Sequence, residues 1–191
     1  MKVGVFGGTF DPIHNGHLIT AVAVKELRSL DKIIFIPSFI APHKIDRLSS
    51  SPMHRIEMLK LAIKGIPCFD YSDFEINKEG VSYTIDTLRF LRNTYDEIEL
   101  IIGYDNLLEF STWKDPYEIL KLVKLVVLKR KVLNEPVEKD KFYYASKIIE
   151  TPTIEISATD IRKRLRNNLP VNFLVPDAVM EYINHFNLYK D

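Results

Sequence analysis

Residues 7 to 17 read GGTFDPIHNGH and hold three of the chain's seven glycines and two of its five histidines. His14 and His17 are three residues apart, so both imidazoles can face one bound group at the start of a helix. Gly7 and Gly8 allow the backbone to approach a ligand closely or to adopt a positive φ. A helix N-terminus adds unpaired N–H groups and a favourable dipole for an anion. Together these features predict a phosphate site.

Other chemistry could use the same residues. The two histidines could be structural, with Gly16 allowing a tight turn into the next helix. Two histidines at this spacing could also bind zinc, but the sequence has no Cys-x-x-Cys, and the remaining histidines show no spacing for a third ligand: His43, His54 and His185. The stretch lacks the G-x-G-x-x-G order of a dehydrogenase loop and the G-K-[ST] of a P-loop. We therefore expect phosphate binding and no protein-held metal.

Composition limits the partners. The 191 residues suit one domain, expected to span 1–191, and 46% of them are hydrophobic. Lys+Arg and Asp+Glu balance at 26 each, which predicts neither a nucleic-acid nor a membrane partner. The single cysteine, Cys68, suits a reducing compartment, and MKVGVF is too short for a signal-peptide core. We expect a cytoplasmic protein, and a homo-oligomer stays possible.

The surrounding segments alternate between strand and helix patterns. Apolar runs predict buried strands at 2–6, 33–37, 98–103 and 125–129, and a further strand is expected over 68–76. Helices are expected at 17–30, 52–64, 82–95 and 159–167, in two pieces within 104–122, and near the C-terminus in 175–189. Ser51 should cap the second of these helices. This order predicts an α/β fold with a Rossmann-like, doubly wound parallel sheet and a ligand at the carboxyl ends of its strands.

GGTFDPIHNGH resembles the signature of the nucleotidylyltransferase superfamily, whose members carry an H-x-G-H motif. Within it, the chain is similar to the bacterial nicotinate-nucleotide adenylyltransferases. The similarity extends to PSFIAPHK (37–44), GVSYTIDTL (80–88), GYDNLLEFSTWK (103–114), ISATDIRKRL (156–165) and LVPDAVMEYI (174–183). The resemblance implies a single nucleotidylyltransferase domain for NAD biosynthesis. Such an enzyme transfers the adenylyl group of ATP, with Mg²⁺, to nicotinate mononucleotide and releases pyrophosphate.

The resemblance also implies roles for individual residues on the ATP side. It gives catalytic roles to His14, His17, Lys44 and Arg162, with His17 nearest the transition state. Around ATP it places Gly7, Gly8, Thr9, Phe10, His43, Ser157 and Thr159. Read without the resemblance, His43 and Lys44 could belong to a solvated loop, and Ser157 or Thr159 could simply cap a helix.

On the mononucleotide side, the resemblance implies Thr84, Gly103, Asp105, Trp113 and Lys114. Thr84 begins a predicted helix whose dipole would favour a nicotinate carboxylate. Trp113, the only tryptophan, could stack on the pyridine ring or could belong to the core. Lys114 stands where the family often has His or Tyr. Acceptors other than nicotinate mononucleotide therefore stay open, namely the amide mononucleotide and phosphopantetheine, as does a nucleotide-binding module without catalysis.

Overall fold

The protein, described here by a computed structural model, is placed over residues 1–40, 50–129 and 139–190. At its centre is a six-stranded sheet of order β3-β2-β1-β4-β5-β6 in which all neighbouring strands are parallel. The strands are β1 (Lys2–Gly8), β2 (Lys32–Pro37), β3 (Phe69–Tyr71), β4 (Glu97–Gly103), β5 (Lys124–Lys129) and β6 (Lys147–Glu150). The strand order reverses between β1 and β4, which confirms the predicted Rossmann-like, doubly wound parallel sheet.

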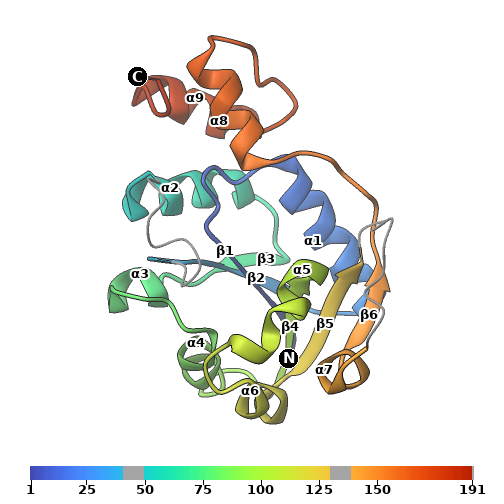
Figure 1. The fold of residues 1–191 in the computed structure, drawn as a ribbon. Helices are drawn as coiled ribbons and strands as arrows, with labels where there is room; N and C mark the ends of the chain where they lie inside the picture. The colour runs from blue at the N-terminus through green and yellow to red at the C-terminus, as the bar shows by residue number, and fades with distance from the viewer. Residues whose placement is uncertain (41–49, 130–138, 191) are drawn as a thin grey trace.

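Helices cover both faces of this sheet (Figure 1). The helices of the described ranges are α1 (Asn15–Arg28), α2 (Pro52–Ile63), α3 (Phe74–Lys78), α4 (Thr84–Leu91), α5 (Tyr104–Leu108), α6 (Pro116–Leu122), α7 (Lys141–Ala145), α8 (Ala158–Arg166) and α9 (Asp177–His185), with a short 3-10 turn, η2, at Phe110–Thr112. Within these ranges, none combines the length and apolarity needed to cross a bilayer.

The strands are apolar on both faces because each face is covered. In β2, Ile33 and Phe35 point into a core shared with α1, α2, α8 and α9. Their neighbours Ile34 and Ile36 point into a second core shared with α4, α5, α6 and α7. This alternation is the period-2 geometry of a strand, applied to a sheet with no solvent-facing side.

The sequence predictions and the structure agree on most elements. Ser51 caps α2 by accepting a hydrogen bond from the backbone N–H of His54, as expected. The predicted strand over 68–76 is wrong in its second half, where the chain forms α3. The strand ends at Tyr71, just before Ser72 and Asp73, and the Ser72 hydroxyl accepts from the backbone N–H of Phe74. Such residues compete with the ladder for backbone hydrogen bonds, so they stop a strand and start a helix.

Besides α3, two elements were not predicted. The helix α7 is only five residues long, and the strand β6 lies at the edge of the sheet with a half-exposed surface. Neither carries the long apolar run or clear period from which elements are recognised in a sequence.

Candidate active site

The loop after β1 lies where the strand order reverses. Gly8, the last residue of β1, is paired with Pro37 at the end of β2, so the two loops that follow these strands leave the same edge of the sheet. Neighbouring β4 ends at Gly103, also at the carboxyl edge. The segments that follow β1, β2 and β4 therefore lie together at one edge of the sheet, around one site.

The two motif histidines meet at the start of α1. His14 is the N-cap residue and His17 the third residue of the helix, and their rings stack with centroids 3.6 Å apart. The backbone N–H of His14 donates to Nδ1 of His17 over 3.3 Å. This bond makes Nδ1 an acceptor, so the neutral His17 ring carries its proton on Nε2 and can donate there. The predicted placement of both imidazoles together is confirmed; their roles toward a phosphate remain a prediction.

The structure tests one of the two uses expected of Gly7 and Gly8, a positive φ. Neither Gly7 nor Gly8 adopts a positive φ; the left-handed residue of this loop is Phe10, with a φ of 48°. A Cβ on Gly8 would lie 2.9 Å from the Phe10 ring. Gly8 therefore makes room for a side chain, because Phe10 is buried and packs edge-on against His17.

Gly16 also has a different role, since it lies inside α1 and not in a turn. A Cβ there would lie 3.1 Å from Nδ1 of His14 and 3.5 Å from Cβ of Ile156. The absence of a side chain at Gly16 thus lets the His14 ring and the segment before α8 approach the same point.

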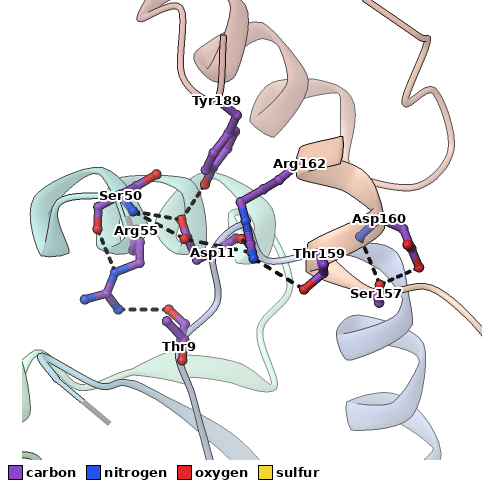
Figure 2. A network of polar contacts seen from close by, with 9 residues as sticks. All are labelled: Thr9, Asp11, Ser50, Arg55, Ser157, Thr159, Asp160, Arg162 and Tyr189. Carbon is purple, nitrogen blue, oxygen red and sulfur yellow. Dashed lines mark hydrogen bonds and ion pairs between the residues drawn. The ribbon is translucent and has the colours of Figure 1, made fainter. Parts of the chain in front are cut away.

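A network of buried polar groups supports the loop, as Figure 2 shows. Arg55 on α2 is fully buried, and it donates to the carbonyl of Thr9 at 2.8 Å and to that of Ser38 at 2.6 Å. It also donates to the carbonyls of Phe39 and Ser50. Burial lowers the pKa of Arg55, and the nearby Asp11 charge opposes this shift. One guanidinium therefore joins the loops after β1 and β2.

The helix α8 contributes the predicted residues of the ISATDIR stretch. Ser157 is its N-cap residue and accepts from the backbone N–H of Asp160 at 3.0 Å, which confirms that one of the two hydroxyl residues caps the helix. Arg162 donates through Nη1 to the carbonyl of Asp11 at 2.6 Å and through Nη2 to Thr159 Oγ1 at 3.3 Å. The structure thus brings Arg162 and Thr159 to the loop after β1 (Figure 2).

His43 and Lys44 lie outside the described residues. Their predicted contacts with phosphate stay predictions.

A pocket of about 380 Å³ opens beside the same loop. Gly7, Gly8 and Thr9 line it, together with four of the five residues predicted on the mononucleotide side: Thr84, Gly103, Trp113 and Lys114. Asp105 is not among the lining residues and lies exposed on α5, whereas its neighbour Asn106 lines the pocket. The first turn of α5 thus presents an amide, and not the predicted carboxylate, to this space.

Trp113 packs against the core and also lines the pocket. Its ring packs 5.1 Å from that of Phe110 and against the core between β4 and α6, yet it lines the pocket. Its Nε1 is buried and has no hydrogen-bond partner among the described residues. The Trp113 side chain is therefore fixed by its packing against the core, and where it lines the pocket it can contact a bound ring.

Charged groups at the pocket edge are paired. Lys114 Nζ lies 3.4 Å from Asp86 Oδ1 and 4.6 Å from the centre of the Tyr83 ring. Asp86 also pairs with Lys78, and the hydrogen bond from that lysine lowers the pKa of the aspartate. Tyr83 is the N-cap residue of α4 but gives no side-chain cap, so the start of this helix faces the pocket without a capping oxygen.

Sequence reasoning missed several residues that the fold brings here. Glu75 on α3 is a buried pocket residue that accepts from Thr87 Oγ1 at 2.5 Å and from Ser82. Burial raises its pKa. Asp11 and Arg55 were also missed. Arg55 and Glu75 lie on helices, where a charged residue ordinarily signals a solvated face, and Asp11 lies in a loop. The sequence therefore held no sign that these side chains would be buried.

Within the described ranges, no group of three or more His, Cys, Asp or Glu residues is placed to hold a metal ion.

The fold and site define the class of the protein, which is that of the α/β nucleotidyltransferases. The family model described as Cytidylyltransferase-like matches residues 5–164. A protein of Caldicellulosiruptor bescii named "Probable nicotinate-nucleotide adenylyltransferase" is 42% identical over the full length of both chains. One of Clostridium botulinum with the same name is 41% identical over 100% of this chain and 98% of its own. The chain belongs to the cytidylyltransferase-like family and, within it, to the nicotinate-nucleotide adenylyltransferases.

A solved structure supports the fold. Nicotinic acid mononucleotide adenylyltransferase of Plasmodium falciparum, complexed with NaAD, superimposes with a TM-score of 0.78 over 98% of this chain and 97% of that one. The two sequences are 19% identical, so this similarity concerns the fold alone.

Proposed function

We propose that the protein transfers the adenylyl group of ATP to nicotinate mononucleotide, yielding nicotinic acid adenine dinucleotide and pyrophosphate in NAD biosynthesis. The observation that carries the proposal is the shared loop after β1. Its first residues line the pocket with Trp113 and Thr84, and it continues into the stacked His14 and His17. A triphosphate and a pyridine ring can thus occupy neighbouring parts of one site.

The reaction requires alignment more than proton transfer. An oxygen of the mononucleotide phosphate attacks the α-phosphorus of ATP, and the bond from that phosphorus to the leaving pyrophosphate breaks. The attacking phosphate is anionic at neutral pH, so it needs no general base. His14 and His17 would donate hydrogen bonds to phosphate oxygens, while Arg162 and Lys44 would balance charge that builds on the leaving group. Gly7, Gly8, Thr9, Phe10, His43, Ser157 and Thr159 complete the proposed ATP site.

Magnesium would enter with ATP. Mg²⁺ is commonly held by substrate phosphates and few protein ligands. The loop carboxylate nearest the proposed triphosphate, Asp11, is already bonded to Tyr189 and Ser50 and lies beside Arg162. The residues present therefore suit an ion carried mainly by the triphosphate, which it would help to neutralise. We place the reaction in the cytoplasm, consistent with the single cysteine.

The pocket favours the acid form of the acceptor. The uncapped start of α4 at Thr84 and the ammonium of Lys114 would both stabilise a nicotinate carboxylate. Trp113 would stack on the pyridine ring, and Gly103 leaves its side of the pocket open because nothing lies within 4 Å of a Cβ there. Phosphopantetheine has no aromatic ring and would leave this wall unused. Asp105 does not line the pocket, and its contact with the mononucleotide stays a prediction.

The test measures pyrophosphate release from ATP and Mg²⁺ with each mononucleotide separately. We expect a higher kcat/KM for nicotinate mononucleotide than for the amide. Equal values would contradict the carboxylate argument. ATP binding without pyrophosphate release would favour a binding module.

A further inference from the structure

Asp11 joins three segments that are far apart in the sequence. Its side chain is 4% exposed. The backbone N–H of Ser50, before α2, donates to both of its oxygens at 3.3 and 3.4 Å. Arg162 of α8 lies 3.9 Å from Oδ2, and Tyr189, near the C-terminus, donates its O–H to Oδ1 at 2.6 Å. Figure 2 shows these groups converging on the loop after β1.

The bond from Tyr189 is the shortest of these contacts. It is charge-assisted, since a neutral phenol donates to a carboxylate, and such bonds are stronger than those between neutral groups. Burial first, and the nearby Asp11 charge second, raise the pKa of Tyr189, so the phenol stays protonated and remains a donor. The backbone of Tyr189 has a φ of 65°, a conformation that an aromatic residue rarely adopts. The C-terminal segment after α9 thus adopts an uncommon backbone conformation at Tyr189, and this conformation places the hydroxyl next to Asp11.

Asp11 in turn holds Arg162. The guanidinium donates to the Asp11 carbonyl and lies beside its carboxylate, so both the backbone and the side chain of one residue orient it. Within the described chain, hydrogen bonds engage Arg162 through Nη1 and Nη2, and the side chain keeps 22% of its surface exposed. A guanidinium has five N–H donors, so it can hold Asp11 and Thr159 and still bind an anion.

We propose that Tyr189 is a positioning residue for adenylyl transfer, which acts through Asp11 to orient Arg162 toward the triphosphate. The inference rests on the proposed role of Arg162 in ATP binding. Tyr189 itself touches neither substrate. The C-terminal segment after α9 therefore belongs to the triphosphate side of the site, although it follows every residue of the predicted motifs.

The experiment measures binding of a nonhydrolysable ATP analogue with Mg²⁺ by calorimetry, using full-length protein. Tyr189→Phe removes one hydroxyl and should raise the Kd of the analogue about tenfold, the scale for losing a hydrogen bond to a charged group. With Arg162→Ala already present, the same change should alter Kd by less than about twofold, because the residue through which it acts is gone. The KM for nicotinate mononucleotide should stay unchanged.

Tyr144→Phe is the matched control, since Tyr144 is 75% exposed on α7, and it should leave Kd unchanged. If Tyr189→Phe lowers stability too far, Asp11→Asn should weaken analogue binding to a similar degree. An unchanged Kd in folded Tyr189→Phe, or an equal effect with and without Arg162, overturns the inference.

The same measurements separate this inference from the proposed function. Wild-type protein that binds the analogue but does not use nicotinate mononucleotide refutes the function and leaves the positioning role to be judged by Kd. Wild-type protein that does not bind the analogue refutes both.

Discussion

The two sides of the site are built by different forces. On the proposed triphosphate side, buried charges hold the backbone: Arg55 bonds to carbonyls of two loops, and Asp11 contacts Ser50, Arg162 and Tyr189. On the proposed pyridine side, Trp113 packs on Phe110, and the ion pairs lie at the more exposed edge of the pocket.

This difference matches what each side would have to do under the proposed function. A group that meets charge developing on phosphate must be held in place before the reaction, because reorganisation during the reaction would raise the barrier. A ring platform needs only a flat surface at contact distance, and packing supplies that. The triphosphate side should therefore tolerate substitution poorly, whereas the pyridine side should lose affinity for one substrate and keep its structure. The following predictions test this contrast.

The largest effect is expected from His17→Ala. Removing one donor to the transition state should lower kcat about 10²–10³-fold, with a smaller change in either KM. Steady-state kinetics with both substrates measure this. His185→Ala, at an exposed position of α9, is the control and should retain wild-type kcat. A loss of less than about tenfold in folded protein would refute the proposed role of His17.

Arg55→Leu should mainly affect stability. Carbonyls of Thr9, Ser38 and other loop residues would lose a buried donor, and we expect the free energy of unfolding to fall by about 3 kcal/mol. Urea unfolding monitored by circular dichroism measures the change. Arg89→Leu is the control, because its side chain is 53% exposed and its ion pair is 3.8 Å long. Equal stability of the two variants would show that the buried network does not hold the loops.

Trp113→Ala should affect one substrate. Loss of stacking worth about 1–3 kcal/mol would raise the KM for nicotinate mononucleotide roughly tenfold or more, with the KM for ATP nearly unchanged. Trp113→Phe keeps an aromatic surface and should recover part of the affinity. Parallel changes in both KM values would assign Trp113 to the core alone and remove the contrast between the two sides.

The smallest effect is expected from Glu75→Gln and concerns pH. Burial raises the pKa of Glu75 in the folded protein above its ordinary value of 4.5. Ionisation therefore costs the folded state more than the unfolded state, and stability that is present below the ordinary pKa is lost as pH rises through the folded pKa. Gln cannot ionise, so its stability relative to wild type should increase over that pH window. Urea unfolding at a series of pH values measures this, and a constant difference would contradict it.

Most elements and several site residues could be predicted because their signals are local. The pairing of His14 with His17 follows from a spacing of three at a helix start, and the cap at Ser51 follows from the residues beside it. The motifs around Thr84 and Trp113 predicted that these residues share one site, and both line the same pocket. The sequence did not show which of Asp105 and Asn106 faces the pocket. Adjacent residues of a helix point in different directions, and in so short a helix the sequence pattern does not show which side faces inward.

Local patterns were enough for the fold class and for the position of the loop after β1, since strand and helix periods and caps involve residues close in the chain. The type of chemistry was implied by the resemblance that the H-x-G-H motif and the other motifs carry. The folded chain alone revealed that Gly8 makes room for Phe10, and that Arg55, Asp11 and Tyr189 support the loop. Asp11 and Tyr189 are 178 positions apart. A contact of that kind leaves no periodic signal, because it depends on where the sheet and its covering helices bring two distant segments together.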